Sequence, residues 1–453
     1  MQYSLWFVLH LVFLKKHEMK NSIILLLAIN LLLSCQNKQV FQQNIITSDI
    51  DNFWEAYDKI VATKDSTAQM EYLEQLFLDK GTLGLNNIMA VRKYTPKEYL
   101  AAINNYPKFW ASIRANTLKS KSLDVKINHS IEQLKELYPA LKPADIYFTI
   151  GAFRTNGTIL SNTVLIGCEM SCADHTTIID ELPEWRQPFF KEYQPLKNID
   201  LLCTHEYVHT QQKPLADNLL SYCLYEGVAE FVSTKAIDKP STTPAVQFGK
   251  NNEQQVKTKF ESDLFRMGIT NNWLWGTNKN ELKIRDLGYY IGYAICEKYY
   301  EQAEDKTQAI EDMIELDFYD ESQIESFVDQ SGFLSKSLTQ LYEEYEASRP
   351  TVINMEPFEN GSQNIDPTNK RITLNFSAPM NTENRGFDYG PLGEEQVLKV
   401  QNVIGFSEDK KSFTFEIKLE PNKHYQSLVT NRFLSESGIP LKAFLIDFKT
   451  TSK

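Results

Sequence analysis

The stretch PLKNIDLLCTHEYVHTQQK, residues 195–213, decides how the central part of this chain folds. It starts at a proline and is followed by Pro214, and its apolar residues and histidines recur at spacings of three and four. This periodicity predicts a helix that carries His205 and His209 on one face. Because two imidazoles one helical turn apart can reach one ion, with Glu206 beside the first, the motif predicts a metal site.

A second predicted helix follows and contains LYEGVAEFVS, residues 224–233. Glu226 and Glu230 lie four residues apart on an otherwise apolar face, where unpaired carboxylates are costly to bury. A metal and its histidines would offset that cost. We therefore expect Glu226 to be the third ligand and Glu230 to orient the imidazole of His205. The alternatives are a structural histidine pair and a solvated glutamate.

Two histidines and a glutamate with one open position are typical of a single catalytic zinc ion. Glu206 is then expected to act as the general base toward water. Tyr290 and Tyr293, in DLGYYIGY, are the candidates for stabilising the oxyanion, because Gly288 and Gly292 would permit close approach; core packing is the alternative. His175 is a further candidate, or an exposed histidine.

The rest of the chain indicates an α+β protein. Residues 1–35 form an expected leader and 36–48 a polar tether. Residues 49–346 form an expected, mostly helical metallopeptidase domain with a small sheet, in which residues 145–167 predict a β-hairpin turning at Asn156-Gly157. Short alternating segments within residues 350–453 predict a separate β-sandwich.

Six motifs of the helical region carry a family resemblance: FWEAYDKI (53–60), DIYFTIGAFRTNGTILS (145–161), LIGCEM (165–170), HEYVHTQQ (205–212), EGVAEF (226–231) and DLGYYIGYAI (286–295). The region resembles the gluzincin peptidases, in which two histidines and a downstream glutamate hold zinc. More closely, it resembles a family of predicted zinc-dependent proteases common in Bacteroidetes-type bacteria. The resemblance covers about residues 50–345 and implies the same roles for His205, Glu206, His209 and Glu226. Glu230 replaces the aspartate often found there.

The last hundred or so residues contain the segments FSAPM (376–380), LEPNKHY (419–425) and SGIPL (437–441). With these segments, this part of the chain resembles the Ig-like domain first named in bacterial surface-layer proteins. This resemblance implies a spacer or adhesion module rather than a catalytic domain.

The amino terminus resembles a bacterial lipoprotein signal. From Met19, the expected true start, one lysine precedes a short apolar run that ends at LLSC, with Cys35 as the residue to be lipidated. An ordinary secretory leader or an uncleaved anchor is the alternative. The signal implies an exported lipoprotein, held at the outer membrane on its periplasmic or surface face by the lipid anchor.

The net charge bears on the class of partner, and the number of cysteines bears on disulfide formation. A net charge of −12 argues against a nucleic-acid partner. Beyond Cys35 five cysteines remain, so not all can pair; Cys168 and Cys172 are spaced for a local disulfide, and buried free thiols are the alternative.

These features favour a zinc peptidase that acts on a peptide or protein substrate. A non-enzymatic envelope lipoprotein that binds a partner through the same scaffold is the second hypothesis, and the intact Glu206 argues against it. Zinc chemistry on cell-wall or glycan components is a third.

Overall fold

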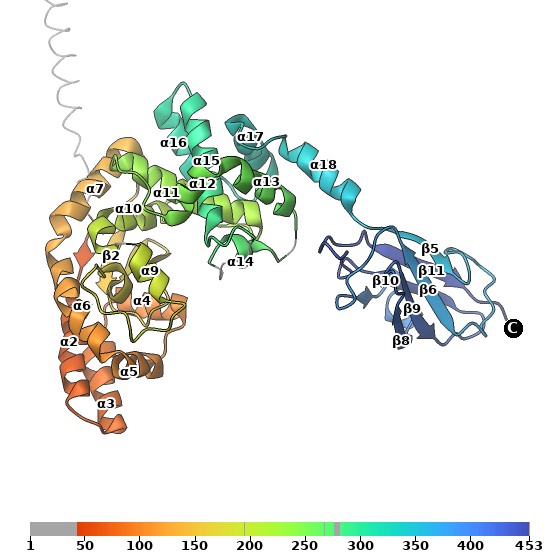
Figure 1. Cartoon of the computed structure of the whole chain (residues 1–453), viewed down its shortest axis with the longest axis horizontal. Coiled ribbons are helices and arrows are strands. Elements are labelled where there is room, and N and C mark those ends of the chain that lie inside the picture. Colours follow the sequence, from red (N-terminus) through yellow and green to blue (C-terminus); the bar gives the residue numbers. More distant parts are fainter. Residues whose placement is uncertain (1–42, 194, 267, 276–280, 453) are drawn as a thin grey trace, which may run out of the picture.

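The computed structural model describes residues 43–193, 195–266, 268–275 and 281–452. Helices dominate as far as Ser348 and strands from Val352 onward, so the protein is α+β overall, as the sequence predicts (Figure 1). The leader expected at residues 1–35, with Met19 and Cys35, lies outside the described residues. No helix in the described ranges is both long and apolar enough to cross a membrane.

The helical part surrounds a small sheet and shares one hydrophobic core. Its helices are α2 (Ser48–Val61), α3 (Ser66–Leu73), α4 (Leu83–Arg92), α5 (Pro96–Asn105), α6 (Pro107–Lys119), α7 (Asp124–Leu137), α8 (Cys168–Ser171), α9 (Gln187–Glu192), α10 (Ile199–His209), α11 (Leu219–Ala236), α12 (Pro244–Asn251), α13 (Glu253–Asp263), α14 (Thr270–Trp273), α15 (Leu287–Gln302), α16 (Lys306–Ile314), α17 (Glu321–Ser331) and α18 (Leu338–Ser348).

The sheet has the strand order β1-β2-β4-β3. Its strands are β1 (Ile45–Ile46), β2 (Asp145–Thr149), β3 (Gly157–Leu160) and β4 (Thr163–Gly167). β1 and β2 run parallel to their neighbours, and β3 pairs antiparallel with β4 as the edge strand. The residues at the end of the expected tether are therefore part of the fold.

The hairpin differs from the sequence prediction in the position of its turn. Its two strands are β3 and β4, joined at Ser161 and Asn162, and Ser161 has a φ of +54°. Asn156-Gly157 is not the turn, because Gly157 is the first residue of β3. β2, the segment assigned to the first arm, is instead a buried inner strand parallel to β4.

The carboxyl-terminal strands form two antiparallel sheets over a second core. One sheet has the order β5-β6-β9-β8 and the other β11-β10-β7. Alternation places Leu374 of β6 opposite Phe413 of β9, both buried. The strands are β5 (Val352–Glu356), β6 (Arg371–Phe376), β7 (Phe387–Asp388), β8 (Val400–Phe406), β9 (Ser412–Ile417), β10 (His424–Val429) and β11 (Phe444–Lys449). Figure 1 shows α18 leading from the helices into these strands.

The five cysteines within the described ranges are free thiols, and all are buried. Cys168 and Cys172 both lie in or directly after α8 without forming a disulfide. Of the two alternatives open from the sequence, the structure therefore has buried thiols.

Candidate metal centre

Helix α10 presents both histidines of the motif to the same point. His205 and His209 are one turn apart, and their Nε2 atoms lie 3.1 Å from each other. The helix is buried along nearly its whole length, and it ends at His209. Both imidazoles are consequently held in the interior, with little freedom to turn away.

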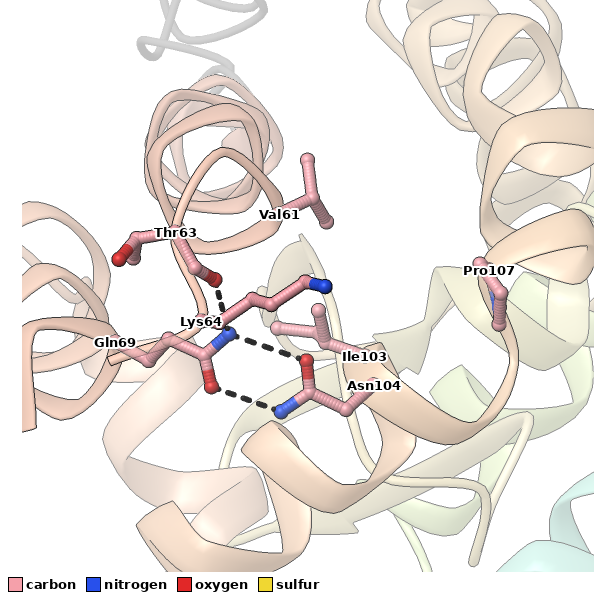
Figure 2. Close-up of a pocket in the computed structure, with 7 residues that line it drawn as sticks. All are labelled: Val61, Thr63, Lys64, Gln69, Ile103, Asn104 and Pro107. Carbon is pink, nitrogen blue, oxygen red and sulfur yellow. Dashed lines mark hydrogen bonds between the residues drawn. The ribbon is translucent and has the colours of Figure 1, made fainter. Parts of the chain in front are cut away.

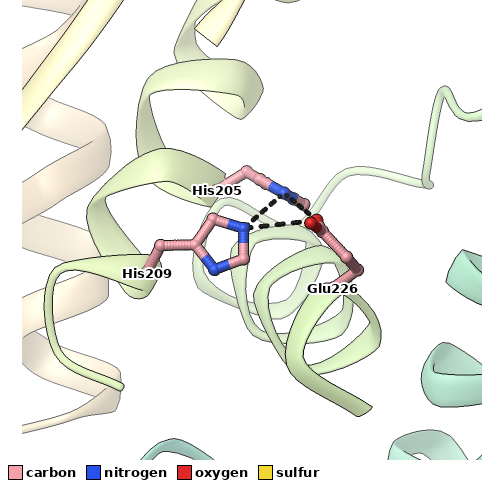
Figure 3. Close-up of side chains that lie close together, drawn as sticks. All are labelled: His205, His209 and Glu226. Atoms are coloured by element: carbon pink, nitrogen blue, oxygen red, sulfur yellow. Dashed lines mark hydrogen bonds and ion pairs between the residues drawn. The ribbon is translucent and has the colours of Figure 1, made fainter. Parts of the chain in front are cut away.

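Helix α11 brings the third group. Asn218 caps its amino terminus by accepting a hydrogen bond from the backbone N–H of Ser221 at 2.9 Å. Two turns later, Oε2 of Glu226 lies 3.4 Å from Nε2 of His205 and 3.3 Å from Nε2 of His209 (Figure 3). The sequence prediction that these three side chains meet agrees with the structure.

The distances within this triad fit a zinc ion. Ligand atoms about 2.1 Å from a tetrahedral zinc lie about 3.4 Å from one another. The three distances of 3.1, 3.3 and 3.4 Å match that spacing closely. His205, His209 and Glu226 could therefore hold one metal ion, and the nitrogen and oxygen donors suit zinc.

The opposite charges of His205 and Glu226 affect their pKa values more strongly than burial does. Burial lowers the pKa of His205, but hydrogen bonds to Glu226 and Glu230 raise it to about 10. Burial opposes ionisation of Glu226, but the charges of His209 and His205 hold its pKa well below the usual range. The carboxylates thus create a negative potential that favours a cation between the imidazoles.

Glu230 holds the outer nitrogen of His205. Its Oε2 lies 3.2 Å from Nδ1 of the imidazole, as the sequence predicts. Its Oε1 accepts hydrogen bonds from the hydroxyls of Ser241 and, at 3.0 Å, Thr243, which lie between α11 and α12. Because Nδ1 is engaged, Nε2 of His205 is the nitrogen directed to the cluster.

His209 has an equivalent partner that sequence analysis missed. Its Nδ1 lies 2.6 Å from Oε1 of Gln212, and the amide nitrogen of Gln212 donates to the backbone oxygen of Tyr225 at 3.0 Å. The ring of Tyr225 stacks on His209 with centroids 4.3 Å apart. Gln212 thereby fixes His209 and ties the end of α10 to α11.

Glu206 lies beside the cluster and under the edge strand. A Cβ placed on Gly157 of β3 would lie 2.5 Å from Oε1 of Glu206, so only glycine leaves room there. Burial raises the pKa of Glu206, while the charges of His205 and His209 lower it to a lesser extent. The structure thus brings the expected base to the metal triad and packs it against β3.

The three tyrosines at the start of α15 face different neighbours. The ring of Tyr289 stacks near His205, with centroids 6.1 Å apart, and burial together with the nearby charge of Glu226 raises the pKa of its hydroxyl. In contrast, the hydroxyl of Tyr290 bonds Glu253 at 3.3 Å, and that of Tyr293 accepts from Lys250 at 3.4 Å. The structure therefore brings Tyr289 to the cluster instead of the two candidates named from the sequence.

Close packing of α11 against α15 explains this arrangement. A Cβ on Gly227 would lie 2.1 Å from the carbonyl carbon of Gly292, so the two backbones touch. Tyr289, three residues before Gly292, meets His205 near the metal centre, whereas Tyr293 packs on Phe231 further along α11. The Gly288 and Gly292 spacing indicates which side of α15 approaches α11, but the position of the crossing decides which tyrosine reaches the cluster.

Two other features lie apart from the cluster. His175 is exposed. A pocket of about 390 Å³ lies between the early helices and is lined by Val61, Thr63, Lys64, Gln69, Ile103, Asn104 and Pro107 (Figure 2). The amides of Gln69 and Asn104 bond each other reciprocally at 3.3 and 3.0 Å, so they serve the packing of the helices.

The comparisons with known proteins support the metal centre. A family model described as "Predicted Zn-dependent protease (DUF2268)" matches residues 188–318, which include α10, α11 and Tyr289. This match agrees with the resemblance to predicted zinc-dependent proteases over that part of the chain. No curated protein matches the chain.

Surface-layer proteins are among the solved structures that align with the chain. The S-layer protein rSbsC(31-844) aligns at 12% identity over 60% of this chain and 38% of its own, with a TM-score of 0.18. The N-terminal part of the bacterial S-layer protein SbsC aligns at 12% identity over 89% of this chain and 77% of its own, with a TM-score of 0.18. The chain spans 38% of the first structure, and TM-scores this low carry no information on fold or function.

Proposed function

We propose that this protein is a zinc-dependent peptidase of the gluzincin type. The observation that carries the proposal is the near-tetrahedral spacing of the ligand atoms of His205, His209 and Glu226, with Glu206 buried beside them. Zinc bound there would supply Lewis acidity toward a peptide carbonyl and toward water.

Glu206 is the residue proposed to move protons. Its carboxylate takes a proton from the attacking water and returns it to the amine of the departing peptide. Gly157 permits Glu206 to lie against the sheet, and Glu230 and Gln212 orient the two imidazoles so that their Nε2 atoms face the metal position.

Tyr289 is the proposed donor to the oxyanion. Its ring is stacked near that of His205 with centroids 6.1 Å apart, and its hydroxyl is close enough to Glu226 for that charge to raise its pKa, in addition to the effect of burial. A phenolic O–H at this position can donate a hydrogen bond to the oxygen that becomes negative when water attacks the carbonyl.

The edge strand β3 is the proposed guide for an extended substrate. β3 is the last strand of its sheet and packs on α10, which carries the motif. An extended peptide that pairs with such an edge gains main-chain hydrogen bonds and lies alongside Glu206.

Zinc analysis and a peptide-library cleavage assay, on the chain from Gln36, test the proposal. We expect stoichiometric zinc that is lost in His205→Ala but kept in His175→Ala, whose histidine is exposed. Glu206→Gln should keep zinc and lose turnover. Zinc without Glu206-dependent turnover would favour the non-enzymatic binding protein, and no zinc would overturn both hypotheses.

The proposed setting is the bacterial envelope, with Cys35 lipidated and an Ig-like carboxyl-terminal domain as a spacer. The lipobox at Cys35 and the two antiparallel sheets over one core support this proposal. Detergent-phase partitioning of the protein expressed from Met19, compared with its Cys35→Ala variant, tests the anchor; equal partitioning would contradict it.

A further inference from the structure

Trp275 is a large apolar side chain that remains exposed close to the metal centre. Its exposed fraction is 49%. Its backbone has a φ of +57°, a conformation that bulky residues rarely adopt because it is strained. Such a residue persists only where the surrounding structure holds it in place.

Asp286 holds the backbone of Trp275 in this position. The backbone N–H of Trp275 donates to Oδ1 of Asp286 at 2.7 Å, and Oδ2 of Asp286 accepts from Nε of Arg285 at 2.6 Å. Asp286 directly precedes α15, which carries Tyr289 beside His205, so Trp275 is held close to the metal triad.

Tyr222 continues this aromatic surface. It lies on α11 one turn before Glu226, and its ring meets that of Trp275 edge to face, with centroids 5.2 Å apart at 89°. Both rings are rigid and only partly buried. Aromatic rings are stabilised by such pairing beyond the area that they bury, so a third ring has a favourable place beside them.

We propose that Trp275 and Tyr222 form one wall of a substrate subsite that accepts an aromatic side chain of the residue next to the scissile peptide bond. The proposal rests on the proposed peptidase function. It follows from the position of Tyr222 one turn before Glu226 on α11 and from its contact with Trp275, because a peptide whose carbonyl reaches the triad must place a neighbouring side chain nearby.

The test compares two peptides that differ only in Phe or Ala beside the cleaved bond, with the zinc-loaded chain from Gln36. We expect kcat/KM to favour the Phe peptide by about tenfold or more. Trp275→Ala should reduce this preference to about threefold or less. Trp275→Phe, which keeps a ring but loses the indole N–H, should retain most of it. Trp185→Ala, which removes a tryptophan that is 69% exposed, is the matched control and should retain it fully.

Binding of two hydroxamates, one with a benzyl and one with a methyl side chain, separates this inference from the peptidase proposal. A benzyl preference that Trp275→Ala removes would support the subsite even if neither peptide is cleaved. Cleavage that depends on Glu206 but shows an unchanged preference in Trp275→Ala would overturn the subsite and leave the peptidase standing. Equal binding of the two hydroxamates, or binding of neither, would also overturn the subsite.

Discussion

Gly157 of the edge strand lies directly against Glu206 of the metal-binding helix, and a Cβ at that position would come within 2.5 Å of Oε1. Gly157→Ala should therefore displace the carboxylate without touching the metal ligands. Because a positioned general base contributes about 10²- to 10⁴-fold, we expect turnover to fall about 100-fold or more with zinc content unchanged. Leu160→Ala, on the exposed end of the same strand, is the control. Normal turnover in Gly157→Ala would show that Glu206 does not need this position.

The tyrosines of α15 provide a matched set of variants. Tyr289→Phe removes the hydroxyl proposed to donate to the oxyanion beside His205, and loss of an oxyanion donor costs about 10²- to 10³-fold in kcat. Tyr290→Phe and Tyr293→Phe remove hydroxyls bonded to Glu253 and Lys250, so they should leave kcat within about twofold. Steady-state kinetics on one cleaved peptide distinguishes them. A loss in Tyr290→Phe or Tyr293→Phe, with Tyr289→Phe active, would restore the assignment made from the sequence.

The site could be read from the sequence where its geometry is local. His205, Glu206 and His209 are fixed by the repeat of one helix, and the spacing of Glu226 and Glu230 identifies the face of the next. The α+β class likewise follows from the change of period after Pro350. Each of these predictions depends on residues that are close to one another in the sequence.

Predictions that depended on tertiary contacts were less successful. The choice among Tyr289, Tyr290 and Tyr293 depends on where α11 crosses α15, which no single helix specifies. The sequence indicates a turn at Gly157 because glycine is favoured both in turns and where another group packs against the backbone. Here the glycine makes room for the side chain of Glu206. Nothing in the sequence except its position three residues after His209 indicates that Gln212 holds this histidine.

The partners of the outer histidine nitrogens should govern zinc affinity. Glu230→Gln keeps the size of the side chain but removes the charge facing Nδ1 of His205. Because such partners contribute about 10- to 100-fold to metal affinity, we expect the zinc Kd to rise by that factor in chelator competition. Thr243→Val removes one donor to Glu230 and should produce a smaller rise. An unchanged zinc Kd in Glu230→Gln would show that Glu230 does not contribute to zinc binding.

The backbone contact between Gly227 and Gly292 should dominate the stability of the helical core. A methyl group at either position has no room, so Gly292→Ala must push α15 away from α11. Overpacking of this kind costs about 1–3 kcal/mol or more in the free energy of unfolding. Urea denaturation measures it, with Glu301→Ala on the exposed face of the same helix as control. Equal stability of the two variants would show that the helices can shift at no cost.

Glu169 should make the stability depend on pH. It is fully buried after β4 and accepts backbone hydrogen bonds from Gly151 at 2.7 Å and Phe153 at 3.0 Å. Burial outweighs these bonds and raises its pKa to about 7, from 4.5. The folded state therefore binds more protons than the unfolded state between these values, so the contribution of Glu169 to the unfolding free energy falls as pH rises from about 4.5 to 7.

Glu169→Gln isolates this effect, because glutamine stays neutral. The variant loses one acceptor for the two backbone N–H groups, so it should be less stable than the wild type at pH 5. Between pH 5 and 7.5 the gap should narrow by up to about 3 kcal/mol, since each pKa unit corresponds to about 1.4 kcal/mol. Urea denaturation of both zinc-loaded proteins at the two pH values measures the change. A gap that is constant or widens with pH would mean that Glu169 is ionised in the folded protein, and that the hydrogen bonds from Gly151 and Phe153 outweigh its burial.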